Sequence, residues 1–226
     1  MRTQILAIDP GNEKSGVVRF EVDDRELYGV KIIESNGAMD NENLLEYIVM
    51  NRLRDCWVAI ETPKPMGMAV AGQTMETLIF IGRLCETVDN LDKQHETGID
   101  WSYVFRMDVK LHLCGQSRAK DTNVTQAIKD RFGGCQKPVK CDDCKGRGKS
   151  GRGKAKAPCE PCSGTGLDKI AGPLHGITKH AWQAMGVGLW FRDNRLVQRK
   201  IINPGGKDNR ESGIKHIEFD QVNVIE

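Results

Sequence analysis

The N-terminal segment Gln4-Ile5-Leu6-Ala7-Ile8-Asp9 is a short apolar run that ends in an acid and is followed by Pro10-Gly11. Residues 15–22 and 27–34 form two further runs that are rich in Val, Ile and aromatic residues, a composition typical of β-strands. The turn-like Asp23-Asp24-Arg25 separates these two runs. Together the three runs predict a three-stranded meander at the start of the chain.

Helical and strand-like patterns alternate after this meander. Two more strands are predicted, at residues 57–60 and 101–107, and the first of them again ends in an acid, Glu61. Apolar residues recur at helical spacing in four segments, which are residues 41–54, 69–94, 122–132 and 177–190. A meander followed by alternating helices and strands predicts an α/β fold, with a mixed five-stranded sheet and helices on both faces.

Composition and charge narrow the class of protein. The chain has 226 residues, of which 39% are hydrophobic and 28% charged, so it has the composition of one globular domain with room for a small module. No apolar run approaches eighteen residues and no apolar signal region follows Met1, so we expect no membrane span and a location in the cytoplasm of a bacterium or a phage-infected host. The net charge is only +2, yet residues 137–156 hold eight of the 33 basic residues and only two acids.

Four of the eight cysteines form two C-x-x-C pairs, Cys141-Asp-Asp-Cys144 and Cys159-Glu-Pro-Cys162, with fourteen residues between the pairs. Two such turns supply the four thiolates that a structural zinc ion prefers. Each pair continues into a C-x-x-C-x-G-x-G repeat, which resembles the zinc module of DnaJ-type chaperones, and the glycines allow positive φ angles. The alternative is a set of redox-active or merely buried thiols. The other four cysteines are expected to be packing residues.

The segment between the two cysteine pairs is rich in Gly, Lys and Arg. It is interpreted as a basic loop that contacts DNA phosphates, because the rest of the chain is slightly acidic and phosphate binding needs a local concentration of positive charge. The alternative is a solvated loop with no ligand. The candidate DNA contacts are Lys145, Arg147, Lys149, Arg152, Lys154 and Lys156.

Asp9 and Glu61 each follow a buried strand, at the end where an α/β sheet usually opens its site. Carboxylates on adjacent strands repel each other unless a cation neutralises them, and oxygen ligands suit Mg²⁺ or Mn²⁺. Two-metal nucleases use this arrangement around a scissile phosphate. Either acid alone would more commonly be a cap or turn residue.

The order of these motifs resembles that of RuvC-type Holliday junction resolvases, a family with the RNase H-like fold. Asp9-Pro-Gly-Asn-Glu-Lys-Ser-Gly16 is similar to the family's first motif, and Val58-Ala-Ile-Glu61 to its second acidic motif. Residues 109–124 resemble the segment before its later helix, and residues 179–185 lie where the family carries its remaining metal ligands. The resemblance implies a nuclease domain over residues 1–134 and 167–226, interrupted by a four-cysteine zinc module over residues 135–166.

The resemblance also implies roles for individual residues. His180 and Gln183 take the place of the family's last pair of ligands, so the site would hold two Mg²⁺ or Mn²⁺ ions with fewer negative charges than an all-acid site. The family's basic catalytic helper aligns ambiguously with Lys120 or Asp121. Met66 and Met68 lie where the family often has an aromatic wedge that unstacks bases.

The resemblance thus implies an endonuclease that resolves branched DNA, with four-way junctions as the expected substrate. Cutting two symmetric strands implies a homodimer, for which the helix over residues 69–94 is a candidate interface. The zinc module in so small a frame indicates a bacteriophage-type protein. Two other functions remain open. One is a non-catalytic zinc-containing nucleic-acid-binding protein with a degenerate site, and the other is an actin-like ATPase, for which the chain is short.

Overall fold

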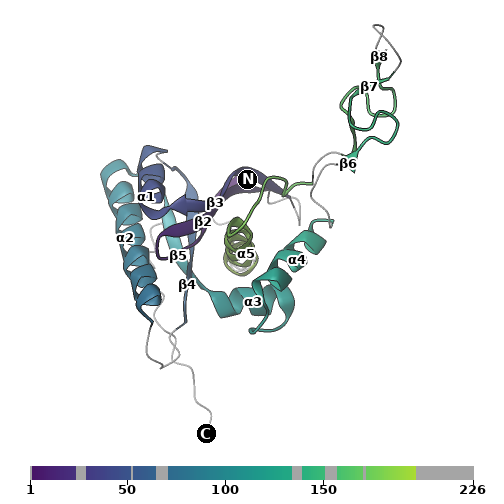
Figure 1. Cartoon of the computed structure of the whole chain (residues 1–226). Coiled ribbons are helices and arrows are strands. Elements are labelled where there is room, and N and C mark those ends of the chain that lie inside the picture. The colour runs from purple at the N-terminus through teal and green to yellow at the C-terminus, as the bar shows by residue number, and fades with distance from the viewer. Residues whose placement is uncertain are drawn as a thin grey trace.

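The computed structural model of the chain describes residues 2–23, 29–51, 53–64, 71–133, 139–150, 157–169 and 172–196. Its main element is a five-stranded sheet with the strand order β3-β2-β1-β4-β5 (Figure 1). The first three strands pair antiparallel, and β4 and β5 run parallel to β1. The RNase H-like α/β fold expected from the sequence is therefore confirmed. The strands are β1 Arg2–Asp9, β2 Lys14–Asp23, β3 Val30–Asp40, β4 Cys56–Thr62 and β5 Asp100–Phe105.

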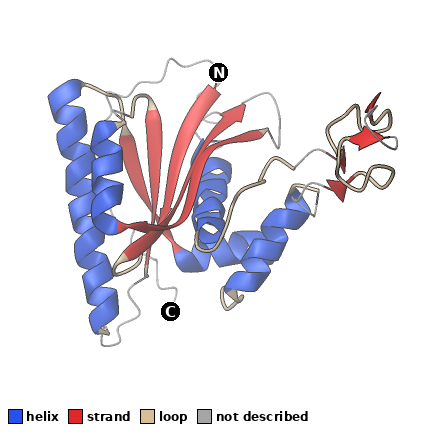
Figure 2. Cartoon of the chain, turned by 45° about the horizontal axis from the view of Figure 1, so that its top comes forward, coloured by secondary structure: helices blue, strands red, loops and turns tan. Residues whose placement is uncertain are grey.

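Helices cover both faces of this sheet (Figure 2). Successive strand residues point to opposite faces, so Leu6 and Ile8 pack towards α1 and α2, while Ile5 and Ala7 pack towards α5. The central strands β1 and β4 are therefore apolar on both sides. The helices are α1 Asn41–Met50, α2 Gly72–His95, α3 Arg106–Cys114, α4 Asp121–Arg131 and α5 Ala181–Phe191.

Helix α5 lies between the sheet and the pair α3 and α4, and most of its residues are buried (Figure 1). Small residues let it approach the sheet closely. A Cβ atom added at Gly188 would lie 2.9 Å from the Cβ of Ala7 on β1. A turn of π-helix, Arg192–Leu196, continues α5. The tight contact fixes the helix relative to the strand ends that carry the candidate site.

Several elements differ from the sequence prediction. Strand β3 runs to Asp40 instead of residue 34, and α1 ends at Met50 instead of residue 54. The last helix begins at Ala181 instead of residue 177, so His180 is the residue just before the helix. Strand β5 ends at Phe105, and the segment after it forms α3, which the sequence did not indicate. Within α3 only Val109 is buried, so the apolar periodicity that would reveal a helix is missing.

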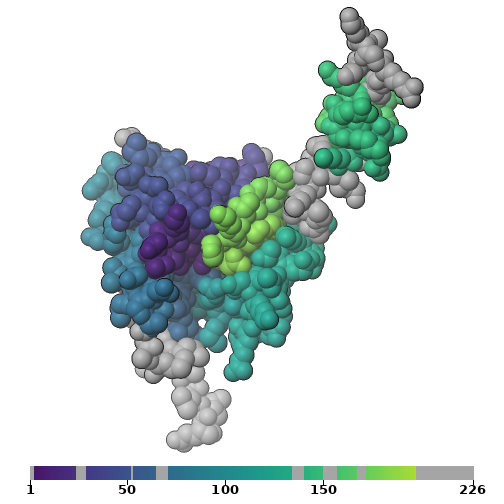
Figure 3. Space-filling view, viewed as in Figure 1, coloured from purple at the N-terminus to yellow at the C-terminus, as the bar shows by residue number. Residues whose placement is uncertain are grey.

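The four paired cysteines lie in a small unit of their own, which we call the cysteine module and define as residues 139–150 and 157–169. It contains two short hairpin-like pairings, β6 Val139–Lys140 with β9 Leu167–Lys169, and β7 Lys149–Ser150 with β8 Ala157–Pro158. Figure 3 shows the module projecting from the main body. Within the described ranges, no helix has both the length and the apolar character needed to span a bilayer.

Candidate functional site

Asp9 and Glu61 lie side by side at the ends of two parallel strands. The register pairs Ile8 of β1 with Ile60 of β4, so the next residue on each strand is an acid. Asp9 is 8% exposed and Glu61 is 7% exposed. Burial raises the pKa of Asp9 to about 6, although Arg106 and His180 work against the shift. Burial, followed by the charge of Asp9, raises the pKa of Glu61 to about 8. The pair therefore favours the approach of a cation.

His180 is the third group at this position. Asp9 pairs across the sheet with Gly16 on β2, and the missing side chain of Gly16 leaves room for the segment before α5. A Cβ atom at Gly16 would lie 2.8 Å from the Cβ of His180. A second glycine, Gly37 on β3, lies against Thr178 and Lys179, and a Cβ atom added there would clash with both. The imidazole Nδ1 consequently lies 3.8 Å from Asp9 Oδ2, and most of the side chain stays exposed.

The loop after Asp9 is held by buried polar contacts. Asn41, at the start of α1, donates from Nδ2 to the carbonyl oxygens of Gly11 and Asn12, each at 3.1 Å. Its Oδ1 accepts a hydrogen bond from the hydroxyl of Ser15 at 2.7 Å. These contacts fix both sides of the hairpin that separates Asp9 from Gly16.

Arg106 joins the site although no role was predicted for it from the sequence, and Asp121 joins it from the segment in which the position of a basic helper was ambiguous. Arg106, the first residue of α3, donates from Nη1 to Glu61 Oε1 at 3.0 Å and from Nη2 to Asp121 Oδ2 at 2.7 Å. Lys110, one turn further along α3, lies 3.1 Å from the other oxygen of Asp121. Partial burial works against ionisation of Asp121, yet Arg106 and Lys110 hold its pKa below the ordinary value. Of the two positions that the resemblance left open for a basic helper, Lys120 and Asp121, it is Asp121 that contacts this network, and it does so as the acidic partner of Arg106 and Lys110.

Gln183 lies in the first turn of α5, near Asp121. Its amide Nε2 donates to the backbone oxygen of Asp121 at 3.3 Å. It also lines a small cavity of about 10 Å³ together with Glu61, Arg106 and Asp121. Gln183 thus connects α5 to α4 beside the carboxylates.

Asp193, further along the chain, belongs to a separate network. His112, Arg131 and Arg192 each bind it, at 2.7–2.8 Å. All three partners come from helices packed around α5 or from its π-helical extension, so Asp193 serves the packing of these elements.

The four cysteines of the module converge on one point. Their sulfur atoms all lie within 4.8 Å of one another, and the cysteines are buried. Cys141 and Cys159 are 3.9 Å apart at Sγ, and Cys144 and Cys162 are 3.8 Å apart. Zinc–sulfur bonds of about 2.3 Å in a tetrahedron place sulfurs about 3.8 Å from each other, so the cluster can hold one zinc ion.

The two C-x-x-C turns have equivalent backbone contacts. Gly148 N–H donates to Cys144 Sγ at 3.3 Å, and Gly166 N–H donates to Cys162 Sγ at 3.2 Å. The glycines of both repeats have positive φ angles, as the sequence predicted. Backbone N–H groups that point at the sulfurs stabilise thiolates and wrap the chain around a metal.

The basic residues of the module divide into two sets. Lys145, Arg147 and Lys149 are all exposed. Two of them also have a partner within the module, because Lys145 lies 3.9 Å from Asp142 and Arg147 donates from Nε to the carbonyl oxygen of Cys144 at 2.9 Å. The remaining candidates for DNA contact, Arg152, Lys154, Lys156, Met66 and Met68, lie outside the described residues.

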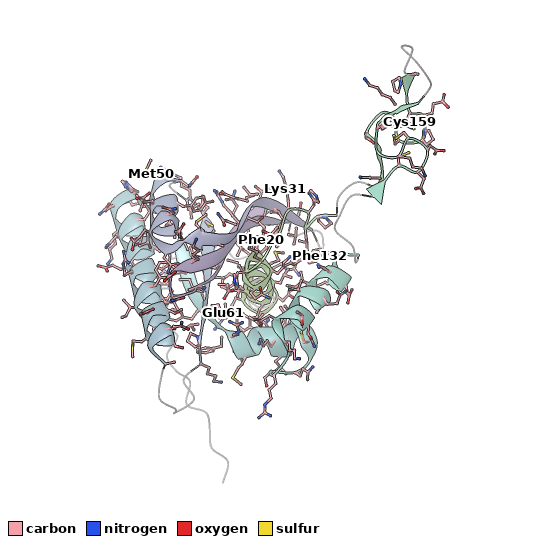
Figure 4. All side chains as sticks on the ribbon, viewed as in Figure 1. Phe20, Lys31, Met50, Glu61, Phe132 and Cys159 are labelled. Carbon is pink, nitrogen blue, oxygen red and sulfur yellow. The ribbon has the colours of Figure 1, made fainter. Side chains whose placement is uncertain are left out.

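Figure 4 shows Glu61 beside α3 at the end of the sheet and Cys159 in the distant module. The strand-end acids and the cysteine cluster are therefore two separate candidate metal sites in one chain.

Among known proteins, the chain is similar to solved structures and not to any family model or curated sequence. No family model matches the chain, and no curated protein matches it. The chain is similar to the structure of Thermus thermophilus RuvC, with 14% identity and a TM-score of 0.48 over 85% of this chain and 96% of that one. It is also similar to T. thermophilus RuvC in complex with a Holliday junction substrate, with 15% identity and a TM-score of 0.47 over 83% of this chain and 92% of that one. The function of this chain is therefore inferred from its own residues.

Proposed function

We propose that the chain is a metal-dependent endonuclease that hydrolyses phosphodiester bonds in branched DNA, with four-way junctions as its substrate. One observation carries the proposal. Two buried carboxyl groups, Asp9 and Glu61, end adjacent parallel strands with raised pKa values, and an exposed imidazole lies 3.8 Å from one of them. A hard cation is the partner that such a pair of acids requires.

The donors fit Mg²⁺ or Mn²⁺. Asp9, Glu61 and His180 would hold the ion, whose Lewis acidity would activate water and stabilise charge on the phosphate. A neutral imidazole has a single acceptor nitrogen, so the alternative role for the exposed His180 is to accept a proton from the attacking water in place of ligating the ion. Arg106 and Lys110 supply positive charge on the other side, where a phosphate oxygen would approach.

The cysteine module would hold one zinc ion and present basic side chains to a DNA arm. Lys145 and Lys149 are exposed on it, and its buried residues form a cluster separate from the two apolar layers of the sheet. These features support the division of the chain into a nuclease domain and an inserted zinc module.

A homodimer would place two such sites on a two-fold symmetric junction. Helix α2 supports this proposal because it exposes large apolar side chains, with Met75 49% and Ile79 60% exposed. Light scattering of the full chain tests it. A mass of two chains is expected, and a mass of one chain at micromolar concentration would reject the dimer.

Replacement of Asp9 by Asn tests the nuclease proposal. Asp9→Asn keeps the size of the side chain but removes its charge, so cleavage of a synthetic four-way junction with Mg²⁺ or Mn²⁺ is expected to disappear while binding remains. Asp40→Asn is the matched control, because Asp40 ends β3 as an exposed carboxylate whose ion pair is with Lys14 and not with a residue of the site. It should cleave like the unmodified chain.

Measurements of junction binding, junction cleavage and ATP hydrolysis by the unmodified chain separate the alternative functions. Junction binding without cleavage by the unmodified chain would support the non-catalytic DNA-binding protein, and ATP hydrolysis without either would support the ATPase. Unchanged cleavage by Asp9→Asn would reject the role assigned to Asp9.

A further inference from the structure

The space between Glu61 and Asp121 already contains a cation. The guanidinium of Arg106 bridges the two carboxylates at 3.0 Å and 2.7 Å, with one nitrogen on each. The second oxygen of Asp121 lies 3.1 Å from Lys110. Both oxygens of Asp121 and one oxygen of Glu61 therefore have a positively charged partner from α3.

The cavity at this position has no room for a hydrated ion. Its volume is about 10 Å³, and a single water needs roughly 10–15 Å³. Arg106 lines it along with the two acids it binds. An ion could enter this side only if the guanidinium left, and Glu61 and Asp121 would then exchange two charge-assisted hydrogen bonds for metal ligation.

The other side of the acid pair is different. Asp9 lies next to Glu61. The exposed imidazole of His180 lies 3.8 Å from the carboxylate of Asp9. A neutral imidazole is a ligand for a divalent metal, whereas a guanidinium is not. The donors that remain for an ion are thus Asp9, Glu61 and His180.

Charge gives the same division. Arg106 and Lys110 make ion pairs with Glu61 and Asp121, whereas the ion pair of Asp9 is with His180. A second divalent ion on the Asp121 side would add two positive charges beside a guanidinium, which like-charge repulsion opposes.

We propose that the site binds one divalent ion, and that Arg106 takes the place of a second ion. This inference rests on the proposed nuclease function and replaces the two ions that the sequence resemblance implied. Arg106 is a positioning residue that links Glu61 to Asp121 and keeps positive charge on that side of the substrate phosphate. Its side chain is 42% exposed, so N–H groups of the guanidinium can also turn to a phosphate oxygen.

Counting bound Mn²⁺ tests the inference without any cleavage. Full-length, zinc-loaded protein is titrated with Mn²⁺, and the free ion is measured by electron paramagnetic resonance. Ions that are still bound by an Asp9→Asn, Glu61→Gln double variant are subtracted as background. The unmodified chain is expected to bind one ion.

Two substitutions at one position distinguish charge from structure. Arg106→Gln removes the positive charge and leaves Asp121 available, so a second Mn²⁺ per chain is expected. Arg106→Lys keeps the charge, so the count should remain at one. A merely structural arginine would give the same count in both variants.

Each outcome has a definite reading. Two ions on the unmodified chain overturn the inference, even if Arg106→Gln does not fold, and so does a folded Arg106→Gln that binds one ion. Two bound ions together with junction cleavage would keep the nuclease proposal and reject the inference. One bound ion without junction cleavage would keep the inference and reject the nuclease proposal. The absence of any bound ion would reject both.

Discussion

Asp9 and Glu61 are carboxyl groups whose burial opposes their charge, so the residues that define the candidate site also weaken the fold. The folded pKa of Glu61, about 8, lies well above its ordinary value of 4.5. Between these two values the folded chain retains a proton that the unfolded chain releases. The contribution of Glu61 to the free energy of unfolding therefore falls as the pH rises from 4.5 to 8.

Replacing Glu61 with Gln should stabilise the protein at alkaline pH. The amide is neutral and similar in size, so it removes the cost of ionising a buried group. In denaturant titrations without added Mg²⁺ or Mn²⁺, we expect the free energy of unfolding to rise by about 1–3 kcal/mol at pH 8 and to change little near pH 4.5.

Asp121 provides the matched comparison because its pKa is shifted the other way. Arg106 and Lys110 keep it ionised, so Asp121→Asn is expected to destabilise the chain under the same conditions. Equal effects of the two substitutions, or a loss of stability in Glu61→Gln at pH 8, would contradict the assigned electrostatics.

The sequence indicated some of these residues and not others for a physical reason. Asp9 and Glu61 each terminate an apolar strand, and this local pattern is visible in the sequence. Arg106 and Asp121 each begin a helix on the surface, where charged residues are common, and only the tertiary fold brings them to the end of β4. An acid at the first position of a helix is a capping signal as well, so its presence alone did not identify a site.

At the scale of elements, the segment before α5 determines where the imidazole lies. It crosses β2 and β3 at two glycines, Gly16 and Gly37, and ends at His180. Gly16 was noted in the sequence as part of the first motif, whereas Gly37 gave no signal, because an isolated glycine in a strand has several explanations.

Gly16→Ala should displace His180. The added methyl group would lie 2.8 Å from the His180 Cβ and closer still to its carbonyl, so this segment must move. A shift of about 1 Å can cost about 100-fold in rate, so junction cleavage is expected to fall by about that factor. Steady-state cleavage and thermal melting together measure the effect.

Gly72→Ala is the control for this substitution. Gly72 begins α2, and nothing lies within 4 Å of an added Cβ atom. The variant should melt at the same temperature or higher and cleave at the normal rate. Normal cleavage by Gly16→Ala would show that the position of His180 is unimportant.

The strands and four of the five helices followed from periodicity because each buries an apolar face in one of the two layers, with α4 packing on α5 and not on the sheet itself. Helix α3 did not, because it buries only Val109, and its role is to carry Arg106 and Lys110 to the site. Helix α3 contributes side chains to the site and little to the apolar core, so its sequence has a weak apolar periodicity.

At the scale of the whole molecule, the buried residues of the cysteine module are separate from those of the sheet and its helices. The sheet and its helices bury two apolar layers, and the cysteine module buries four sulfurs. The module has too little apolar surface to fold without its metal, as is common for small zinc units.

Loss of one zinc ligand should therefore affect the module alone. Cys144→Ser is expected to release the zinc, leave the main melting transition in place and weaken junction binding about tenfold or more at low salt. Metal analysis, calorimetry and junction titration at two salt concentrations measure the three effects. Cys114→Ser, which alters a half-buried cysteine outside the module, should keep the zinc and the affinity.

A lower temperature for the main transition in Cys144→Ser would show that the two cores are coupled. Unchanged affinity at both salt concentrations would show that the basic residues of the module do not face DNA.

The module leaves the chain after α4 and returns before the segment that carries His180, and within the described residues it pairs with none of the five sheet strands. Lineages of this scaffold can for that reason lengthen, shorten or exchange the appendage without altering the hydrogen bonding of the sheet. The contacts with DNA and the catalytic chemistry would then evolve separately. The first would change with the sequence and length of one surface insertion, and the second with a few charged side chains.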